Sequence, residues 1–450
     1  MQMVVIGGTA AGLSAAAKAR RLDRKMEIDV FEATSYVSYG SCGLPYFVGG
    51  CIAQPEELVS LTVEELREKR GIAAHTRHRV LAIDREGKAV KVLALDSGRE
   101  SWQRYDRLVL ATGASPVMPP IPGADGPGVC TLRTVEDGIR LKQLAGKAKH
   151  VVVIGGGFIG LELSEQLALR GLEVALVEAQ PRLLPAFPEK YAGMAAGELA
   201  RHGVALHTGA KAAAILRDEK KQVIGLRLAD GRQLPAELVV VAAGVRPNIL
   251  LARDCGLALG STGGILVDER QQTTDPAIWA CGDCVEMRHL LTQKPCWFPL
   301  GTTANKQGRV AGENAAGGQA RFPGVLGSQV TKVFDLYLAA TGLGLEQALS
   351  QGFEAQAVSI TKSDRASYYP GGGENHLTLV FRRKDGRLLG AQGAGSATVP
   401  GRIDLLVAAI TWGASVSRLG ELDLVYSPPV APVYDPILIA ASQAAKQVSG

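Results

Sequence analysis

Cys42 is the residue best suited to redox chemistry, because it lies among small and turn-forming residues at positions 38–46. A cysteine reacts as its thiolate, which forms at neutral pH where the surroundings are electropositive and partly open to solvent. Pro45 suits the first turn of a helix, so Cys42 is expected at or near a helix N-terminus. A lone cysteine is more often a small buried apolar residue. The nucleotide-binding pattern that precedes this stretch favours a single redox-active cysteine instead.

The segment before Cys42 follows the order strand, glycine-rich turn, helix, strand and acidic residue. We expect strands over residues 3–6 and 28–31 and a helix over 13–22. This order is typical of a dinucleotide-binding unit, in which pyrophosphate meets free N–H groups at the helix N-terminus and the acid accepts from a ribose. Thr9 replaces the middle glycine, so the layout of the elements carries the prediction. The expected contacts are Gly7, Gly8, Thr9, Ala10, Ala11, Gly12 and Glu32.

A second unit of the same kind follows, this time with all three glycines. We expect strands over 151–154 and 173–177 and a helix over 161–170. Two such units predict two dinucleotides. The acid that ends the second unit favours a free ribose 2′-hydroxyl, and therefore NADH, while Arg182 nearby keeps NADPH as an alternative. The expected contacts are Gly155, Gly157, Phe158, Ile159, Gly160 and Glu178.

Further segments are expected to complete the flavin site. Glycine turns close both units, and a short apolar strand delivers a Gly-Asp pair whose carboxylate can hold a ribityl or phosphate-linked hydroxyl. A helix beginning near residue 303 would return towards the flavin. Cys281 and Cys284 have a metal-ligand spacing, but no second pair follows, so we expect no metal. The additional expected contacts are Ala111, Thr112, Gly113, Gly244, Gly282, Asp283 and Ala304.

The 450 residues allow about three domains. We expect an α/β chain with a FAD-binding domain in two parts (1–115 and 246–324), an NAD(P)H-binding domain (116–245) and a C-terminal α+β domain (325–450). The net charge of +5 is too slight to indicate nucleic acid. Seven cysteines indicate individual thiols in a reducing compartment. Without a signal segment or an apolar run of ~20 residues, we expect a cytoplasmic protein that does not contact membranes.

This order of motifs resembles the FAD-dependent pyridine nucleotide-disulfide oxidoreductases over essentially the whole chain. Within them, Ser-Tyr-Gly-Ser-Cys-Gly-Leu-Pro-Tyr at 38–46, Tyr-Tyr-Pro-Gly at 368–371 and Tyr-Ser-Pro-Pro at 426–429 look most like the single-cysteine coenzyme A-disulfide reductases. Their relatives include NADH-dependent coenzyme A-persulfide and polysulfide reductases. Glutathione-reductase-like members carry a second cysteine where this chain has Phe47, and peroxidases and oxidases carry a histidine at the position of Ala10.

The resemblance implies that electrons pass from NADH through FAD to a disulfide between Cys42 and coenzyme A. It also implies a homodimer whose partner subunit donates Tyr426, our first choice of proton donor to a thiolate, and Tyr368, our second. From the residues alone, packing explains both tyrosines, and a solvated helix end explains Lys18 and Arg21 as well as a phosphate site does. The positions that match coenzyme A contacts are Ser14, Lys18, Arg21, Ser38, Ser41, Arg70 and Asn305.

Two other functions stay open. One is an NADH oxidase that reduces oxygen through a sulfenic acid on Cys42. The other is a carrier-protein reductase or a flavin-holding scaffold without thiol chemistry, for which replacing Cys42 would have no effect. The choice between coenzyme A disulfide, persulfide and polysulfide as the acceptor also stays open, because all three would use the same site.

Overall fold

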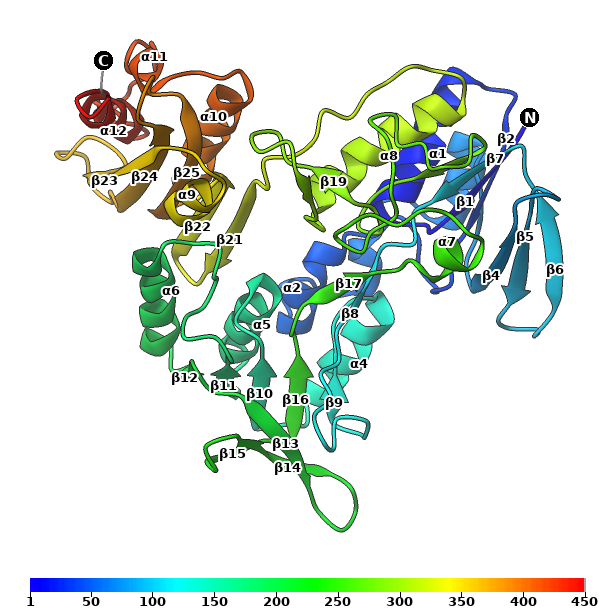
Figure 1. Cartoon of the computed structure of the whole chain (residues 1–450). Coiled ribbons are helices and arrows are strands. Elements are labelled where there is room, and N and C mark those ends of the chain that lie inside the picture. Colours follow the sequence, from blue (N-terminus) through cyan, green and yellow to red (C-terminus); the bar gives the residue numbers. More distant parts are fainter. Residues whose placement is uncertain (449–450) are drawn as a thin grey trace.

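The first nucleotide-binding unit is a parallel five-stranded sheet with helices packed against it (Figure 1). The structure is a computed structural model that describes residues 1–448. The strands, in order across the sheet, are β18 (Ile278–Ala280), β7 (Arg107–Leu110), β1 (Gln2–Ile6), β2 (Glu27–Phe31) and β3 (Ala73–His75). The apolar run of β1 is buried because both faces of the sheet are covered. The strand-turn-helix-strand order expected here is therefore confirmed.

Two helices cross closely over this sheet. They are α1 (Ala10–Leu22) and α8 (Gly301–Ala315). A Cβ on Gly308 would lie 2.2 Å from the carbonyl oxygen of Ala11, and one on Gly312 would lie 2.1 Å from that of Ala15. Only glycine therefore lets α8 approach the backbone of α1 so closely. The late strand β18 and helix α8 return to the first unit after the second unit has been completed.

The second unit repeats the parallel sheet, with strands in the order β12 (Ala205–His207), β11 (Glu173–Val177), β10 (His150–Ile154), β16 (Leu238–Val241) and β9 (Val129–Cys130). Its helices are α4 (Val135–Ala145), α5 (Phe158–Leu169) and α6 (Glu189–Arg201). The expected helix 161–170 thus begins three residues earlier, directly after the glycine turn. The chain enters and leaves this unit through β8 (Ala114–Pro116) and β17 (Val245–Pro247), which pair antiparallel.

The C-terminal unit is a five-stranded antiparallel sheet. In order across the sheet, its strands are β21 (Gln329–Val333), β22 (Leu336–Gly342), β25 (Leu388–Gly395), β24 (Glu374–Arg382) and β23 (Ala355–Ser363). Helices α10 (Val399–Thr411) and α12 (Pro436–Ala445) pack on it. Helix α6 of the second unit also packs on this sheet, where the Tyr191 hydroxyl lies 2.7 Å from that of Thr378. The α+β character expected of this region is confirmed.

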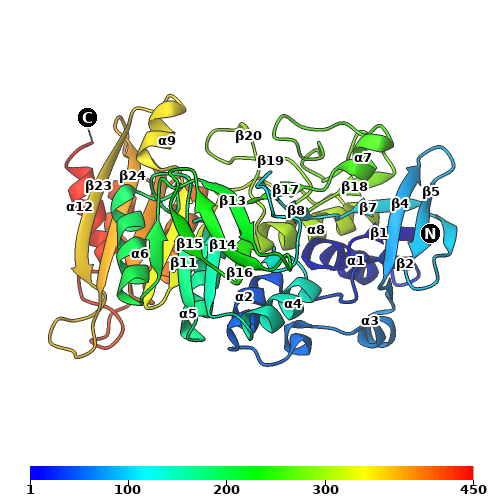
Figure 2. The ribbon, with the colours of Figure 1, turned by 90° about the horizontal axis from the view of Figure 1, so that it is seen from below.

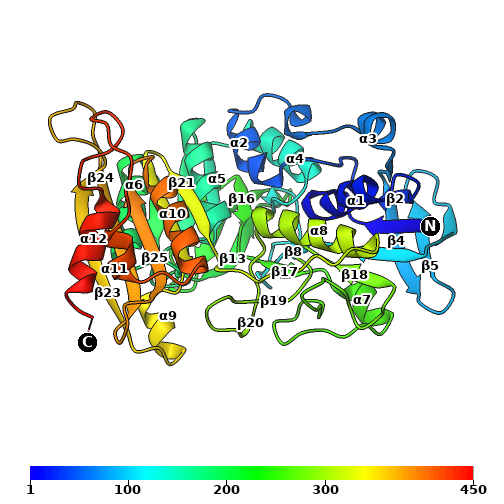
Figure 3. The ribbon, with the colours of Figure 1, turned by 90° about the horizontal axis from the view of Figure 1, so that it is seen from above.

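The remaining described elements form smaller pieces around these sheets. Figures 2 and 3 show the C-terminal unit at one end of the molecule and the first unit at the other. Residues 78–94 form two antiparallel strands joined by a turn. No helix within residues 1–448 is long and apolar enough to cross a bilayer. The smaller elements around the three sheets are η2 (Pro55–Leu58), α3 (Val63–Arg70), β4 (His78–Asp84), β5 (Ala89–Ala94), β6 (Glu100–Arg104), β13 (Ala212–Arg217), β14 (Val223–Leu228), β15 (Gln233–Pro235), α7 (Leu250–Asp254), β19 (Met287–Arg288), β20 (Pro295–Cys296), α9 (Leu345–Ser350) and α11 (Val416–Gly420).

Candidate active site

Cys42 lies in η1 (Ser41–Gly43), a single 3₁₀ turn that leads into α2 (Leu44–Gly49). Pro45 occupies the first turn of α2, where its missing N–H has no helical partner to lose. Leu44 and Phe47 are buried against α4 and α5, so the helix is fixed from both sides. Cys42 itself is exposed. The expectation of a cysteine beside a helix N-terminus is confirmed.

The electrostatic surroundings of Cys42 differ from the electropositive setting expected. Partial desolvation raises the pKa of the Cys42 thiol above its ordinary value, and the negative charges of Glu162 and Asp283 raise it further. Arg133 and a hydrogen bond with Ser41 act in the opposite direction. The thiol is therefore accessible to a reactant, while the carboxylates of Glu162 and Asp283 oppose its ionisation.

The first glycine turn is shaped by close backbone contacts. A Cβ on Gly7 would lie 2.1 Å from the Ala111 carbonyl oxygen, and one on Gly12 would lie 1.9 Å from the Gly7 carbonyl oxygen. Glu32 braces the turn, because its Oε2 accepts a hydrogen bond from the Gly8 N–H at 2.8 Å. Thr9 precedes α1 without capping it through its side chain. The first N–H groups of α1 thus carry no side-chain partner at the cap.

The second glycine turn repeats this geometry. A Cβ on Gly155 would lie 2.3 Å from the Ala242 carbonyl oxygen, and one on Gly160 would lie 1.8 Å from the Gly155 carbonyl oxygen. Glu178 Oε2 accepts from the Gly156 N–H at 2.6 Å. Open space surrounds the Cβ position of Gly157 at the start of α5. The two acids expected to meet a ribose therefore also hold the turns in place.

Both glycine turns lead into helices whose N-termini have no capping side chain, which suits the binding of a dinucleotide. Neither α1 nor α5 has a capping side chain or an acidic residue in its first turn. By contrast, α3 and α4 each carry a capping box and acidic residues there. An uncapped N-terminus presents N–H groups and positive potential to a phosphate, whereas an acid in the first turn would repel it. The chain therefore leaves open the two helix ends where the sequence predicts pyrophosphate.

Of the other residues expected at the cofactors, Ala111, Thr112 and Gly113 follow β7, and Gly282 and Asp283 follow β18, its neighbour in the first sheet. After β7, the Thr112 hydroxyl donates to the Asn248 carbonyl oxygen at 2.7 Å. After β18, the Gly282 N–H donates to Gln307 Oε1 at 3.0 Å. Asp283 pairs with Arg133 at 3.0 Å, a partner that the sequence did not reveal. Ala304 is buried in α8, and Gly244 has a positive φ and open space around it.

The residues that match coenzyme A contacts are spread over η1, α1, α3 and α8. The Ser14 hydroxyl donates to Asn305 Oδ1 at 2.6 Å, which joins α1 to α8. Lys18 pairs with Glu313 of α8 at 2.8 Å. The backbone N–H of Ser38 donates to the Gly8 carbonyl oxygen at 2.8 Å, so the cysteine loop is tied to the first glycine turn. Ser41 begins η1 beside Cys42.

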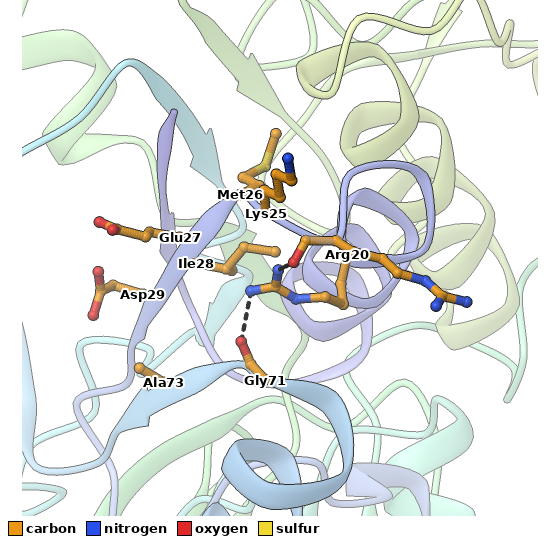
Figure 4. Close-up of a pocket in the computed structure, with 9 residues that line it drawn as sticks. Arg20, Lys25, Met26, Glu27, Ile28, Asp29, Gly71 and Ala73 are labelled. Atoms are coloured by element: carbon orange, nitrogen blue, oxygen red, sulfur yellow. Dashed lines mark hydrogen bonds between the residues drawn. The ribbon is translucent and has the colours of Figure 1, made fainter.

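Two exposed arginines lie at adjoining helix ends. Arg21 is in the last turn of α1, and Arg70 is the last residue of α3. Arg20 joins these ends, because its guanidinium donates to the Gly71 carbonyl oxygen at 2.7 Å (Figure 4). An open pocket beside this contact is lined by residues of α1, β2 and their connection, including Lys25. The structure thus places Arg21 and Arg70 on neighbouring ends of a basic surface.

Tyr368 and Tyr426 contact one another, and their hydroxyl oxygens are 2.9 Å apart. Both side chains are exposed on the C-terminal unit. The hydrogen bond with Tyr368 raises the pKa of Tyr426 above its ordinary value. The β23–β24 loop, which carries Tyr368, lies well apart from α2 in Figures 1, 2 and 3. Within one chain, the structure therefore does not bring these hydroxyls to Cys42.

Two acids of α5 that the sequence analysis did not identify face the site and the C-terminal sheet. Glu165 is 2% exposed and accepts from Lys332 Nζ at 2.9 Å and from the Phe334 N–H at 2.8 Å. Glu162 lies one turn earlier and accepts from the Thr331 hydroxyl at 3.5 Å. Both acids belong to the helix that packs against α2. Their positions follow from which face of α5 meets β21, and the glycine motif alone does not specify that face.

Comparisons with known proteins match this arrangement over nearly the whole chain. The family model described as pyridine nucleotide-disulphide oxidoreductase matches residues 1–308, and its dimerisation domain matches residues 328–436. The NAD(P)H sulfur oxidoreductase (CoA-dependent) of Pyrococcus furiosus is 38% identical over 442 residues, which cover 98% of each chain. An NADH oxidase of Methanocaldococcus jannaschii is 36% identical over 455 residues and covers 100% of both.

Solved structures agree in fold. A NAD-dependent persulfide reductase from A. fulgidus has a TM-score of 0.95 and 40% identity, covering 99% of this chain and 83% of that one. The reduced CoADR-RHD of Bacillus anthracis has a TM-score of 0.96 and 34% identity, covering 99% of this chain and 80% of that one. With the uncapped helix ends and the turns described above, these matches show that the chain belongs to the FAD-dependent pyridine nucleotide-disulphide oxidoreductases.

Proposed function

We propose that this protein uses NADH to reduce coenzyme A disulfide or coenzyme A persulfide through Cys42. The observation that carries the proposal is the place of this thiol. Cys42 is exposed at the start of α2, and its ionisation responds to Asp283 of the first nucleotide unit and to Glu162 of the second. The accessible sulfur of Cys42 thus lies where the two units meet.

The chemistry at Cys42 is thiol–disulfide exchange. Its thiolate attacks one sulfur of coenzyme A disulfide, which forms a mixed disulfide on Cys42 and releases one coenzyme A thiolate. With the persulfide, the same attack releases hydrosulfide. The glycine turn at 7–12 and Glu32 would hold the FAD, whose chemistry there would be the transfer of two electrons from NADH to the Cys42 sulfur. Splitting the mixed disulfide with these two electrons returns the Cys42 thiolate and releases a coenzyme A thiolate.

Basic residues support coenzyme A as the thiol carrier. Its nucleotide end carries phosphates, which cationic side chains and helix ends recognise. Arg21 and Arg70 lie on adjoining ends of α1 and α3. Nearer the start of α1, Ser14, Lys18 and Asn305 lie where this helix contacts α8. The CoA-dependent sulfur oxidoreductase and the persulfide reductase named above support the same class of substrate.

We propose a homodimer formed through the C-terminal unit, the part matched by the dimerisation model. Several large apolar residues there are exposed, including Val425 at 87% and Trp412 at 83%. Exposed apolar side chains gathered on one unit indicate a protein interface. The partner subunit would bring its own tyrosine pair to Cys42, which one chain alone does not do. In this role, Tyr426 would donate a proton to a leaving thiolate.

We also propose a cytoplasmic location. All seven cysteines are free. Free thiols persist where the compartment is reducing.

The experiment that tests the function is anaerobic NADH oxidation by the purified protein, with coenzyme A disulfide and coenzyme A persulfide offered side by side. Turnover of either one, lost in Cys42→Ser, is the expected result. The faster acceptor identifies the physiological substrate class. Activity with neither acceptor, together with NADH oxidation coupled stoichiometrically to oxygen, would instead establish the oxidase function that the M. jannaschii relative carries in its name.

A further inference from the structure

Glu162 is a half-buried carboxyl without a cationic partner. It lies in the second turn of α5, on the side that packs against α2 and β21. Its one hydrogen bond to a side chain is a long one, 3.5 Å from the hydroxyl of Thr331, which is itself 3% exposed. None of the ion pairs formed within residues 1–448 includes Glu162. One turn on, Glu165 is paired with Lys332 and the Phe334 N–H.

Burial without a partner makes the charge of Glu162 costly. Desolvation raises its pKa to about 7, against a smaller opposite effect of the Thr331 hydrogen bond and a further increase from Glu165. The same negative charge raises the pKa of Cys42 and of Tyr46 in the opposing segment. Glu162 thus opposes the ionisation of the Cys42 thiol. Because repulsion between two negative charges is mutual, a Cys42 thiolate in turn favours the neutral form of Glu162.

The ionisable groups around this pair come from each packed element. Cys42 and Tyr46 face α5 from the η1–α2 segment, and Lys332 faces it from β21 in its pair with Glu165. On the flavin side, the charges of Asp283 and Arg133 act on Cys42 in opposite directions and are themselves 3.0 Å apart. Since these four charged groups form two pairs, Glu162 is the charge near Cys42 that is left uncompensated.

We propose that Glu162 is a positioning residue that takes a proton from solvent when Cys42 becomes a thiolate and returns it when that sulfur becomes a neutral disulfide. This inference rests on the proposed role of Cys42 as the reacting thiol. No electrons move in this step, and the proton is exchanged between one carboxylate oxygen and water. A neutral Glu162 removes the negative charge that would otherwise disfavour the thiolate.

The sign of the pH dependence follows from this coupling. Below the pKa of Glu162, its carboxyl is neutral and does not oppose the thiolate. Above that pKa, the carboxylate keeps the thiol protonated to higher pH. The Cys42 titration in the native protein is therefore spread over a wider pH range than that of an isolated thiol. Glu162→Gln carries no charge at any pH, so its Cys42 should ionise at lower pH and follow a single-proton curve.

The test measures the alkylation rate of Cys42 in the reduced holoenzyme as a function of pH. After reduction and anaerobic removal of the reductant, iodoacetamide labelling is followed by mass spectrometry of the Cys42 peptide between about pH 6 and 11, a range that includes the raised midpoint of the native thiol. Glu173→Gln, at an exposed side chain of β11, is the matched control, and the exposed thiol Cys51 gives an internal control in every sample. Thr331→Val removes the donor that favours ionised Glu162, and its curve should shift in the same direction but less.

The expected result is a midpoint at lower pH in Glu162→Gln and alkylation at least about twofold faster near pH 7.5. Glu173→Gln and the Cys51 peptide should be unchanged. An unchanged or higher midpoint in Glu162→Gln would overturn the proposal, and so would a Thr331→Val curve shifted to higher pH. If Glu162→Gln does not retain flavin, Thr331→Val alone decides. Labelling requires no coenzyme A, so failure of the proposed substrate leaves this result interpretable.

Discussion

Glu165 is expected to hold the second nucleotide unit against the C-terminal sheet. Its side chain is 2% exposed, and its two oxygens accept from Lys332 Nζ at 2.9 Å and from the Phe334 N–H at 2.8 Å. Glu165→Gln preserves the shape but leaves one carbonyl oxygen for two donors, so the new NH₂ group faces a donor. A hydrogen bond to a buried charged group contributes about 1.5–3 kcal/mol.

The expected loss is about 2–3 kcal/mol in the free energy of unfolding. This loss corresponds to one bond of the two, because the carbonyl oxygen of the new amide can still accept from one donor and solvent screens the share of Lys332, which is 36% exposed. For units of this size, such a loss lowers Tm by roughly 4–10 °C. Differential scanning calorimetry measures the shift. The matched control is Glu100→Gln, whose exposed pair with Lys91 should contribute less than about 1 kcal/mol.

An unchanged Tm in Glu165→Gln would refute this reasoning, because the buried carboxylate would then contribute no more than an exposed one. Equal shifts in Glu165→Gln and Glu100→Gln would refute it as well. The effect should also reach the site. The adjacent Gln166 Oε1 accepts from the Cys51 thiol at 3.4 Å, directly beyond α2. We therefore expect turnover with either coenzyme A substrate to fall in the same variant.

Three further predictions concern the reaction. In Cys42→Ser, NADH should still bleach the flavin absorbance in anaerobic stopped flow while disulfide reduction is lost; a turnover equal to that of the native protein would contradict the account. Tyr368→Phe removes the hydrogen bond that raises the pKa of Tyr426. In a pH-rate profile, the fall in turnover at high pH should therefore move to lower pH. If this fall does not move, the tyrosine pair is not the proton donor. Glu178→Gln keeps an oxygen for the Gly156 N–H but loses the carboxylate proposed to hold the ribose of NADH. The KM for NADH should therefore rise about tenfold while that for NADPH does not, and an equal rise of both in steady-state kinetics would be the opposing result.

The glycine turns were predictable because their causes are local. Gly7 and Gly155 take positive φ values, which the tight turn between strand and helix requires. The carbonyl groups that they lie against, of Ala111 and Ala242, come from distant parts of the sequence. The position of Cys42 was predictable for the same reason, since Pro45 marks the first turn of a helix. In these places, residue type and spacing determine the geometry directly.

Long-range packing was not predictable in this way. Glu162 contacts Thr331, which is 169 residues away, and Arg133 contacts Asp283, which is 150 residues away. No local pattern states which face of α5 meets β21. Strand β8, at the entry to the second unit, pairs with β17, which comes only after that unit. The tyrosine pair is visible in the sequence as two separate motifs, and only folding brings its hydroxyls together.

The most direct measurement of the central claim is mass spectrometry of the Cys42 peptide after turnover is quenched with acid under anaerobic conditions. The protein is supplied with limiting NADH and excess coenzyme A disulfide, which should accumulate the resting mixed disulfide. We expect coenzyme A bound through a disulfide to Cys42, with Cys51 unmodified. A coenzyme A adduct on another cysteine instead, or a Cys42 that remains free, would contradict this assignment.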